Sequence, residues 1–289
     1  MCRLLGLLAA EPQTAEAWLV RSDRSLLAQS SASPETSQRD GWGIGWFEPT
    51  DRVRIEKGIG GAFEEGERSR FERAAADAKG TVVIGHLRRA SNPLRLTHEQ
   101  LIGLENSQPF GTHTVLFAHN GSIPFPNETR PYLGVHAGEV RGVNDSEVLF
   151  RLILRHLEEV RDPFRAYAHA VDDLDRVWVD VGRPTVDPYS GLNVLLSTAP
   201  SELWAFSLSR GEHGVGLLDR SRPYYEMAYR AEPHRLLIGS EPFDRTPGVW
   251  QPLSSGQYLH ARLRGEHVEL ETGAIPTPAP APAARPREG

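Results

Sequence analysis

Cysteine is nearly absent from this sequence. Cys2 is the single cysteine among 289 residues. One thiol excludes an internal disulfide bond, and it leaves no basis for a zinc site built from cysteines. A lone cysteine is most often a small buried hydrophobic residue, so the interpretation of Cys2 depends on where in the chain it stands.

Basic residues are fewer than acidic residues. The chain has 32 Lys and Arg residues against 38 Asp and Glu residues, which gives a formal net charge of −6. Nucleic-acid-binding domains normally carry a basic surface. We therefore expect no nucleic-acid partner.

Long apolar runs are missing as well. No stretch approaches the roughly 18 residues that indicate a membrane span. Residues 1–10 hold a short apolar segment with one positive charge, and Glu11 and Pro12 follow without a cleavage-like site. This pattern favours a mature N-terminus over a signal peptide. We expect a cytoplasmic protein that makes no membrane contact.

The overall composition is that of a globular protein. Hydrophobic residues make up 39% and charged residues 24% of the chain, and the length suits one large domain or two small ones. Residues 274–289 are rich in Pro and Ala and have too little apolar surface to pack, so we expect a disordered tail there. The folded domain should span residues 2–273.

The apolar pattern predicts a mixed α+β fold. Helices are expected at 64–79, with Gly80 as the residue just past the end, from Asn144 or Asp145 through Leu157, and at 163–179, with Pro163 in the first turn. The order of strands, helix, strands, two helices and strands suits two sheets with helices outside them. Strands are expected at 3–9, 42–47, 52–57, 81–87, 114–119, 192–198, 202–208, 225–230, 235–240 and 257–270, the last with a turn at Arg264-Gly265.

The position of Cys2 suggests nucleophilic catalysis. Aminopeptidase removal of Met1 would leave Cys2 with a free α-amine. The reference pKa of that amine, near 7.7 to 8.0, lets it accept the thiol proton at working pH. No helper histidine is then needed. The alternative is that Cys2 merely begins a buried strand.

Asn120 and Gly121 follow His119 at the end of an apolar strand. A side-chain amide and a backbone N–H can together stabilise an oxyanion, and glycine lets the backbone come close to a ligand. The alternative is a hairpin turn, because Asn-Gly is a frequent turn signal.

Two charged residues stand at the ends of predicted elements. Arg88 follows a strand and can bind a carboxylate through two parallel hydrogen bonds, with the Ser91 hydroxyl close by. Asp145 begins a helix, where capping is its ordinary role, and its carboxylate can also hold an ammonium group. Taken singly, each residue has a structural explanation.

Together these residues fit one ligand, glutamine. Arg88 suits its α-carboxylate and Asp145 its α-ammonium. Asn120 and Gly121 suit its γ-carbonyl oxygen, and Cys2 would attack its γ-carbon. Ser91 and His119 complete the set that we expect to contact the substrate.

At this point the sequence resembles the class II glutamine amidotransferases. The matching segments occur in family order over about residues 2–242, and each is weak alone. They are Met1-Cys2-Arg3-Leu4-Leu5-Gly6, Asp40-Gly41-Trp42-Gly43, Gly85-His86-Leu87-Arg88-Arg89-Ala90-Ser91, Asn106-Ser107-Gln108-Pro109-Phe110, Ala118-His119-Asn120-Gly121, Asp145-Ser146-Glu147 and Gly239-Ser240-Glu241-Pro242.

The resemblance implies a four-layer αββα sandwich, the N-terminal-nucleophile (Ntn) hydrolase fold, with the active site between the sheets. It implies that Cys2 is the nucleophile, that Asn120 and Gly121 form the oxyanion hole, and that Arg88 and Asp145 bind the substrate. It implies no cofactor and no metal. The sequence looks most like stand-alone members, and is more distantly similar to the ergothioneine-pathway γ-glutamyl hydrolase and the yeast glutathione-degrading enzyme.

Two departures from the family pattern leave the substrate open. Arg89, Ser91 and Asn92 stand where many members have an aromatic residue and a later Thr-His pair. We also expect no synthase domain after Gly239. The leading hypothesis is an amidohydrolase that acts on glutamine or a γ-glutamyl amide, a small-molecule substrate. The alternatives are a glutaminase subunit that delivers ammonia to a separate synthase subunit, and a catalytically silent ligand-binding or scaffold protein. A homo-oligomer is compatible with each hypothesis.

Overall fold

The computed structural model describes residues 2–33 and 36–276. Residues 277–289, most of the predicted tail, lie outside the described residues. The last strand runs to Ala274, and the side chain of Ile275 is buried in a hydrophobic core. Regular packing therefore continues to Ile275.

Antiparallel strands form two sheets. Sheet A has seven strands in the order β11-β9-β10-β1-β4-β2-β3, and sheet B has six in the order β13-β12-β8-β7-β6-β5. The strands of sheet A are β1 (Arg3–Thr14), β2 (Trp42–Phe47), β3 (Val53–Gly58), β4 (Lys79–Leu87), β9 (Met227–Glu232), β10 (Arg235–Gly239) and β11 (Gln251–Leu253). Those of sheet B are β5 (Phe110–Gly111), β6 (Leu116–Gly121), β7 (Leu192–Ser197), β8 (Glu202–Ser207), β12 (Gln257–Arg264) and β13 (His267–Ala274).

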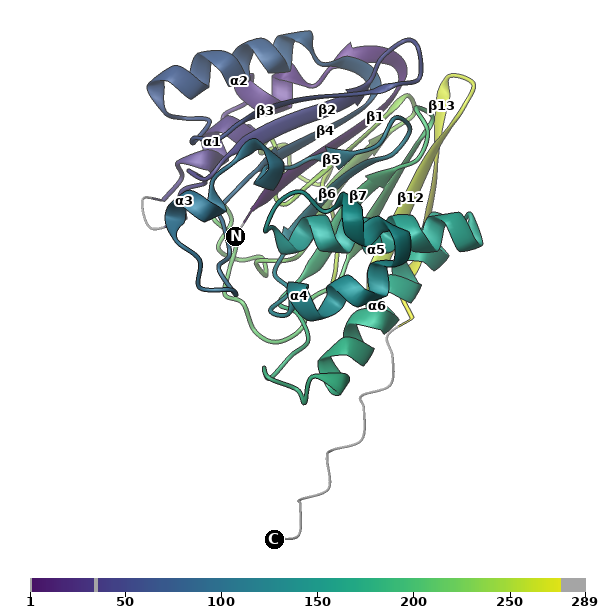
Figure 1. Cartoon of the computed structure of the whole chain (residues 1–289). Coiled ribbons are helices and arrows are strands. Elements are labelled where there is room, and N and C mark those ends of the chain that lie inside the picture. The colour runs from purple at the N-terminus through teal and green to yellow at the C-terminus, as the bar shows by residue number, and fades with distance from the viewer. Residues whose placement is uncertain (1, 34–35, 277–289) are drawn as a thin grey trace, which may run out of the picture.

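Helices lie outside both sheets (Figure 1). The long ones are α2 (Glu65–Asp77), α5 (Asp145–Val160) and α6 (Pro163–Asp180). Pro163 stands in the first turn of α6, as its sequence position predicts. The short ones are the π-helix η1 (Ala17–Arg21), the α-helices α1 (Leu26–Ser30), α3 (His98–Leu101) and α4 (Pro126–Thr129), and the 3-10 helices η3 (Leu104–Asn106) and η4 (Arg130–Glu139).

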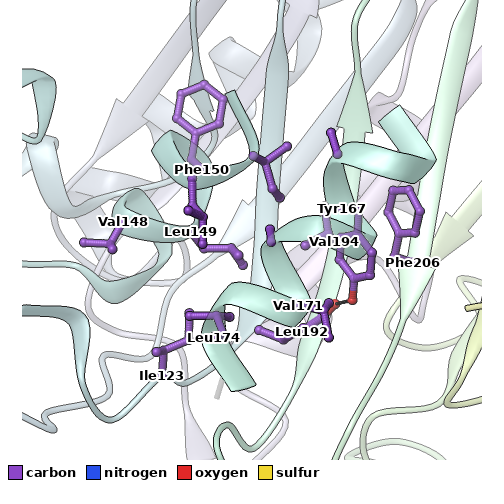
Figure 2. Close-up of a cluster of buried hydrophobic side chains, with 14 of the residues drawn as sticks. Ile123, Val148, Leu149, Phe150, Tyr167, Val171, Leu174, Leu192, Val194 and Phe206 are labelled. Carbon is purple, nitrogen blue, oxygen red and sulfur yellow. Dashed lines mark hydrogen bonds between the residues drawn. The ribbon is translucent and has the colours of Figure 1, made fainter. Parts of the chain in front are cut away.

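Three buried clusters separate four layers. One packs η1, α1 and α2 against sheet A, and a second packs α5 and α6 against sheet B. Figure 2 shows part of the second cluster, in which the α6 residue Tyr167 lies beside Phe206 and its hydroxyl donates to the Leu192 carbonyl. The third cluster lies between the sheets. The predicted four-layer αββα sandwich, an α+β fold, is confirmed.

Strand alternation decides which side chains enter the space between the sheets. Neighbouring residues of a strand point to opposite faces. Leu4 and Leu8 of β1, and Leu116 and Ala118 of β6, belong to the inter-sheet cluster. Cys2 precedes Leu4 by two residues and Asn120 follows Ala118 by two, so both point toward that space.

One alternative and one prediction that rest on glycine are wrong. The strand expected at 114–119 continues through Gly121, which lies opposite Leu192 of β7, so Asn120-Gly121 is not a hairpin turn. Gly80 does not follow a helix end, because α2 closes at the cap Ala78 and Gly80 already belongs to β4. A Cβ at Gly80 would lie 2.7 Å from the Phe47 carbonyl oxygen, so close strand packing, and not helix capping, requires the glycine there.

Candidate active site

A pocket at the ends of β1, β4 and β6 gathers most of the predicted site residues. It is lined by Cys2, Arg88, Ser91, Gly121 and Asp145, among others, and holds about 410 Å³ of space including its opening to solvent. These residues are up to 143 positions apart in the sequence. The two sheets and the start of α5 bring them together.

Cys2 lines this pocket and is buried. Its thiol donates to the Arg89 carbonyl oxygen, with Sγ 3.6 Å from that oxygen. Burial raises the pKa of the Cys2 thiol, and the nearby Arg88 guanidinium opposes that rise. The thiolate, which is the nucleophilic form, is therefore favoured by a neighbouring positive charge and disfavoured by burial.

Arg88 follows β4 and is almost fully buried. Its Nη1 donates to the carbonyl oxygens of Asp40 and Leu101, at 3.1 and 2.9 Å. Within the described parts of the chain, its Nε and Nη2 make no hydrogen bond. Burial lowers the pKa of Arg88, and Cys2, Asp40 and Asp145 oppose the shift. The guanidinium is held on one side and free to bind an anion on the other.

Asp145 is the first residue of α5, and Asn144 is the capping residue before it. The Asp145 carboxylate accepts from the backbone N–H of Ile123 at 2.7 Å and of Ser146 at 3.0 Å. Burial raises the pKa of Asp145, whereas these two N–H donors and the Arg88 guanidinium oppose the rise. Its carboxylate is thus fixed in direction at the wall of the pocket.

Asn120 and Gly121 end β6. The Asn120 side chain is fully buried, and its Oδ1 and Nδ2 have no hydrogen-bond partner among residues 2–33 and 36–276. Backbone N–H groups along a strand point alternately to its two edges. The His119 N–H bonds to the Gln108 side chain on the edge away from β7. The Gly121 N–H therefore points to that same edge, where the pocket lies.

His119 is not part of the pocket wall. Its ring is fully buried on the opposite face of β6 from Asn120, where Nδ1 lies 2.9 Å from the Ser146 hydroxyl oxygen and Nε2 lies 3.1 Å from the Gly191 carbonyl oxygen. Burial lowers the pKa of His119. The ring is therefore neutral, with Nε2–H donating to Gly191 and Nδ1 accepting from Ser146. Both nitrogens are occupied, which leaves none for a substrate.

Several residues that support the site were missed by sequence reasoning. The Asp40 carboxylate accepts from the Ala90 N–H at 2.8 Å and so holds the segment that follows Arg88. The Asn92 side chain closes the turn to Leu96 with two hydrogen bonds. Both residues lie in or beside segments that match the family. That match is the sequence feature that could have identified them.

A second missed group lies beside Cys2 on the helix-facing side of sheet A. The Arg3 guanidinium is fully buried, 4.5 Å above the Tyr224 ring and 4.0 Å from the Glu241 carboxylate. Glu241 also accepts from the backbone N–H groups of residues 217–219 and pairs with Arg24. This carboxylate ties the start of β1 to the segment before β9.

Within 2–33 and 36–276 no group of three or more His, Cys, Asp or Glu side chains is arranged to hold a metal ion. No helix in the same part of the chain has the length and apolarity needed to cross a bilayer.

Similarity to known proteins identifies the family and the fold. A family model described as glutamine amidotransferases class-II matches residues 1–236. Comparison with curated protein sequences gives no significant match. One similar solved structure is a glutamine aminotransferase class-II domain protein from Silicibacter pomeroyi, with a TM-score of 0.62 and 18% identity over 94% of this chain and 100% of that one.

A second similar structure is glutamine phosphoribosylpyrophosphate amidotransferase from B. subtilis. Its TM-score is 0.58 and its identity 17%, over 93% of this chain and 49% of that chain. At these identities the two likenesses show the shared fold. The family match covers most of the sequence, and so the chain belongs to the class II glutamine amidotransferases and is an enzyme with the N-terminal-nucleophile hydrolase fold.

Proposed function

We propose that this enzyme hydrolyses the γ-glutamyl amide of glutamine or of a γ-glutamyl compound through a thioester on Cys2. The observation that carries the proposal is the single pocket lined by Cys2, Arg88, Gly121 and Asp145. A thiol, an anion-binding guanidinium, a backbone donor and a carboxylate match the γ-carbon, α-carboxylate, γ-carbonyl and α-ammonium of one γ-glutamyl ligand.

Acylation begins when the Cys2 sulfur attacks the γ-carbonyl carbon. The proton of the thiol passes to the α-amine of Cys2, which can then deliver it to the leaving nitrogen as the carbon–nitrogen bond breaks. The proposal requires Cys2 to be the first residue of the active chain, because only then is its nitrogen a base. Ammonia or an amine leaves, and a γ-glutamyl thioester remains.

The oxyanion that forms during attack needs donors. The Asn120 Nδ2–H and the Gly121 N–H are the proposed pair. Their support is the Asn120 amide, which no group in the described residues engages, and the edge to which the Gly121 N–H points. Water then attacks the thioester through a second tetrahedral intermediate and releases glutamate, which restores the Cys2 thiol.

The test uses purified protein whose N-terminus is established by intact mass. Wild type and Cys2→Ala are incubated with glutamine, glutathione and γ-glutamylcysteine, and released glutamate is measured together with ammonium. We expect glutamate from wild type with at least one substrate and none from Cys2→Ala. Equal activity of Cys2→Ala, or full activity of protein that retains Met1, would refute the proposed mechanism.

The substrate panel also separates hydrolysis from the glutaminase-subunit alternative. Hydrolysis predicts that ammonium or amine appears in solution in a one-to-one ratio with glutamate. A subunit that serves a synthase would release little glutamate by itself. No release from any of the three compounds by correctly processed protein would favour that alternative.

A further inference from the structure

Gln108 bridges the two sheets at the active site. It belongs to the Asn106-Ser107-Gln108-Pro109-Phe110 segment, to which the proposed reaction gives no role. The side chain is almost fully buried. Its Oε1 accepts from the His119 N–H at 2.7 Å, and its Nε2 donates to the His119 carbonyl oxygen at 3.1 Å. The side-chain amide thus takes the place of a neighbouring strand.

The Gln108 side chain fills this role because β5 is very short. Only Phe110 and Gly111 pair with β6, opposite Phe117 and Leu116. Beyond this point no strand of residues 2–33 and 36–276 lies beside the outer edge of β6. Gln108 continues the hydrogen bonding to His119, and the next N–H on that edge belongs to Gly121.

The backbone of Gln108 rests on the other sheet. A Cβ built on Gly43 of β2 would lie 2.3 Å from the Gln108 carbonyl oxygen and 2.9 Å from Pro109 Cδ. Gly43 therefore allows the Gln108 backbone to lie directly against sheet A. Gln108 therefore contacts sheet A, which carries Cys2, and forms hydrogen bonds with the strand of sheet B that carries Asn120 and Gly121.

We propose that Gln108 is a positioning residue that sets the distance between the Cys2 nucleophile and the oxyanion donors of β6. The inference rests on the proposed function. The inference predicts that variants of Gln108 stabilise the tetrahedral intermediate less and bind the substrate as before. The α-carboxylate and α-ammonium contacts of Arg88 and Asp145 come from other segments. A misplacement of about 1 Å between reacting groups can cost on the order of 100-fold in rate.

The experiment compares Gln108→Glu with wild type. The carboxylate keeps the shape and the acceptor for the His119 N–H, but it places an oxygen against the His119 carbonyl in place of a donor. We expect kcat to fall about 10- to 100-fold with little change in KM. Binding of glutamate γ-semialdehyde, which forms a tetrahedral adduct with a thiol, should weaken by a similar factor. Binding of the product glutamate should change less than threefold, an order-of-magnitude bound for a ground state that is not perturbed.

Two further variants keep the test decisive. Gly43→Ala leaves Gln108 unchanged but displaces its carbonyl, so it should give the same pattern. Gln29→Met is the matched control, because Gln29 is another fully buried glutamine, donating to the Arg24 carbonyl at 3.0 Å in α1. It should lower thermal stability and leave kcat and aldehyde binding unchanged.

The readouts separate positioning from general damage. Alkylation of Cys2 by iodoacetamide, which needs no oxyanion donor, should proceed at the wild-type rate in Gln108→Glu. An unchanged kcat, or an equal loss of aldehyde and glutamate binding, would overturn the inference. Activity in Cys2→Ala would overturn the proposed function itself. An inactive Cys2→Ala with a normal Gln108→Glu would remove this inference alone.

Discussion

Asn120, like Arg3, is a buried polar residue near the pocket whose side chain has no hydrogen-bond partner in the described chain. Buried side-chain amides nearly always have hydrogen-bond partners, yet neither polar atom of Asn120 has one among residues 2–33 and 36–276. Leaving such a group unpaired costs about 1 to 3 kcal/mol. That cost is offset only if a ligand engages the amide, which is the behaviour expected of an oxyanion donor.

Replacing Asn120 by Ala should therefore separate catalysis from stability. We predict that kcat falls by about 10²- to 10³-fold, the usual loss for one oxyanion donor, with a smaller change in KM. The melting temperature should change little, because no partner in the described chain is left unsatisfied. Steady-state kinetics and thermal unfolding measure both. A preserved kcat with lowered stability would assign Asn120 to packing.

Arg88 is predicted to bind the substrate carboxylate. Arg88→Ala should lower kcat/KM about ten- to a hundredfold, mainly through KM, since one charge-assisted contact contributes about 1.5 to 3 kcal/mol. Arg88→Lys should recover only part of the loss, because an ammonium lacks the two-pronged geometry. Glutamine with its α-carboxylate amidated should be a poor substrate for wild type and lose little more in Arg88→Ala. If the losses caused by amidation and by Arg88→Ala simply add, the Arg88 guanidinium does not contact the α-carboxylate.

Asp145 predicts a pH dependence of substrate affinity. Burial raises the pKa of its carboxyl group, whereas an unperturbed aspartate titrates near 3.9. Only the ionised carboxylate attracts an ammonium. As pH falls through the raised value, KM for glutamine should rise, beginning at higher pH than an ordinary aspartate would give. Kinetics across the acid range for wild type and Asp145→Asn test this. The variant should have a high KM that does not rise further as pH falls through this range.

At the scale of elements, strand alternation explains which site residues could be foreseen. Cys2, Arg88 and Asp145 were found because their residue types stand at the ends of predictable strands and helices. His119 was assigned to the substrate, but it neighbours Asn120 on β6. Adjacent residues of a strand face opposite ways, so once Asn120 faces inward His119 must face α5. Alternation alone could have corrected that assignment.

Gln108 and Glu241 could not be given roles from sequence. Each acts through specific side-chain contacts that the pattern of strands and helices does not encode. Gln108 forms hydrogen bonds with His119 of β6, 11 residues away in the sequence, whereas Glu241 pairs with Arg24, 217 residues away. The motifs containing them were visible, but local patterns carry no information about such partners.

Glu241 gives a stability prediction for the elements it joins. Glu241 is 1% exposed, and its carboxylate binds three backbone N–H groups and the Arg3 and Arg24 guanidinium groups. Removing one member of a buried ion pair costs about 3 to 5 kcal/mol. Glu241→Ala should lower the free energy of unfolding in urea by that order. Glu72→Ala, which breaks an exposed pair with Arg68, should cost about 0 to 1 kcal/mol. Equal small losses would contradict the role of Glu241.

At the scale of the whole molecule, the site exists only where the two sheets meet. The proposed nucleophile Cys2 directly precedes β1 of sheet A, and Arg88 directly follows β4 of the same sheet. Asn120 and Gly121 end β6 of sheet B, and Asp145 begins the helix that covers sheet B. Neither half of the sandwich holds the complete set. The general fold followed from the order of strands and helices, whereas the spacing between the sheets depends on side chains such as Gln108 that the pattern does not reveal.

The central claim is that Cys2 is the nucleophile of a γ-glutamyl pocket. The most direct measurement is intact and peptide mass spectrometry after exposure to diazo-oxo-norleucine, a glutamine analogue with an electrophilic carbon. The account predicts one adduct per chain, located on Cys2, blocked by excess glutamine and accompanied by loss of glutamate release. An adduct on another residue, or activity that survives complete labelling of Cys2, would contradict it.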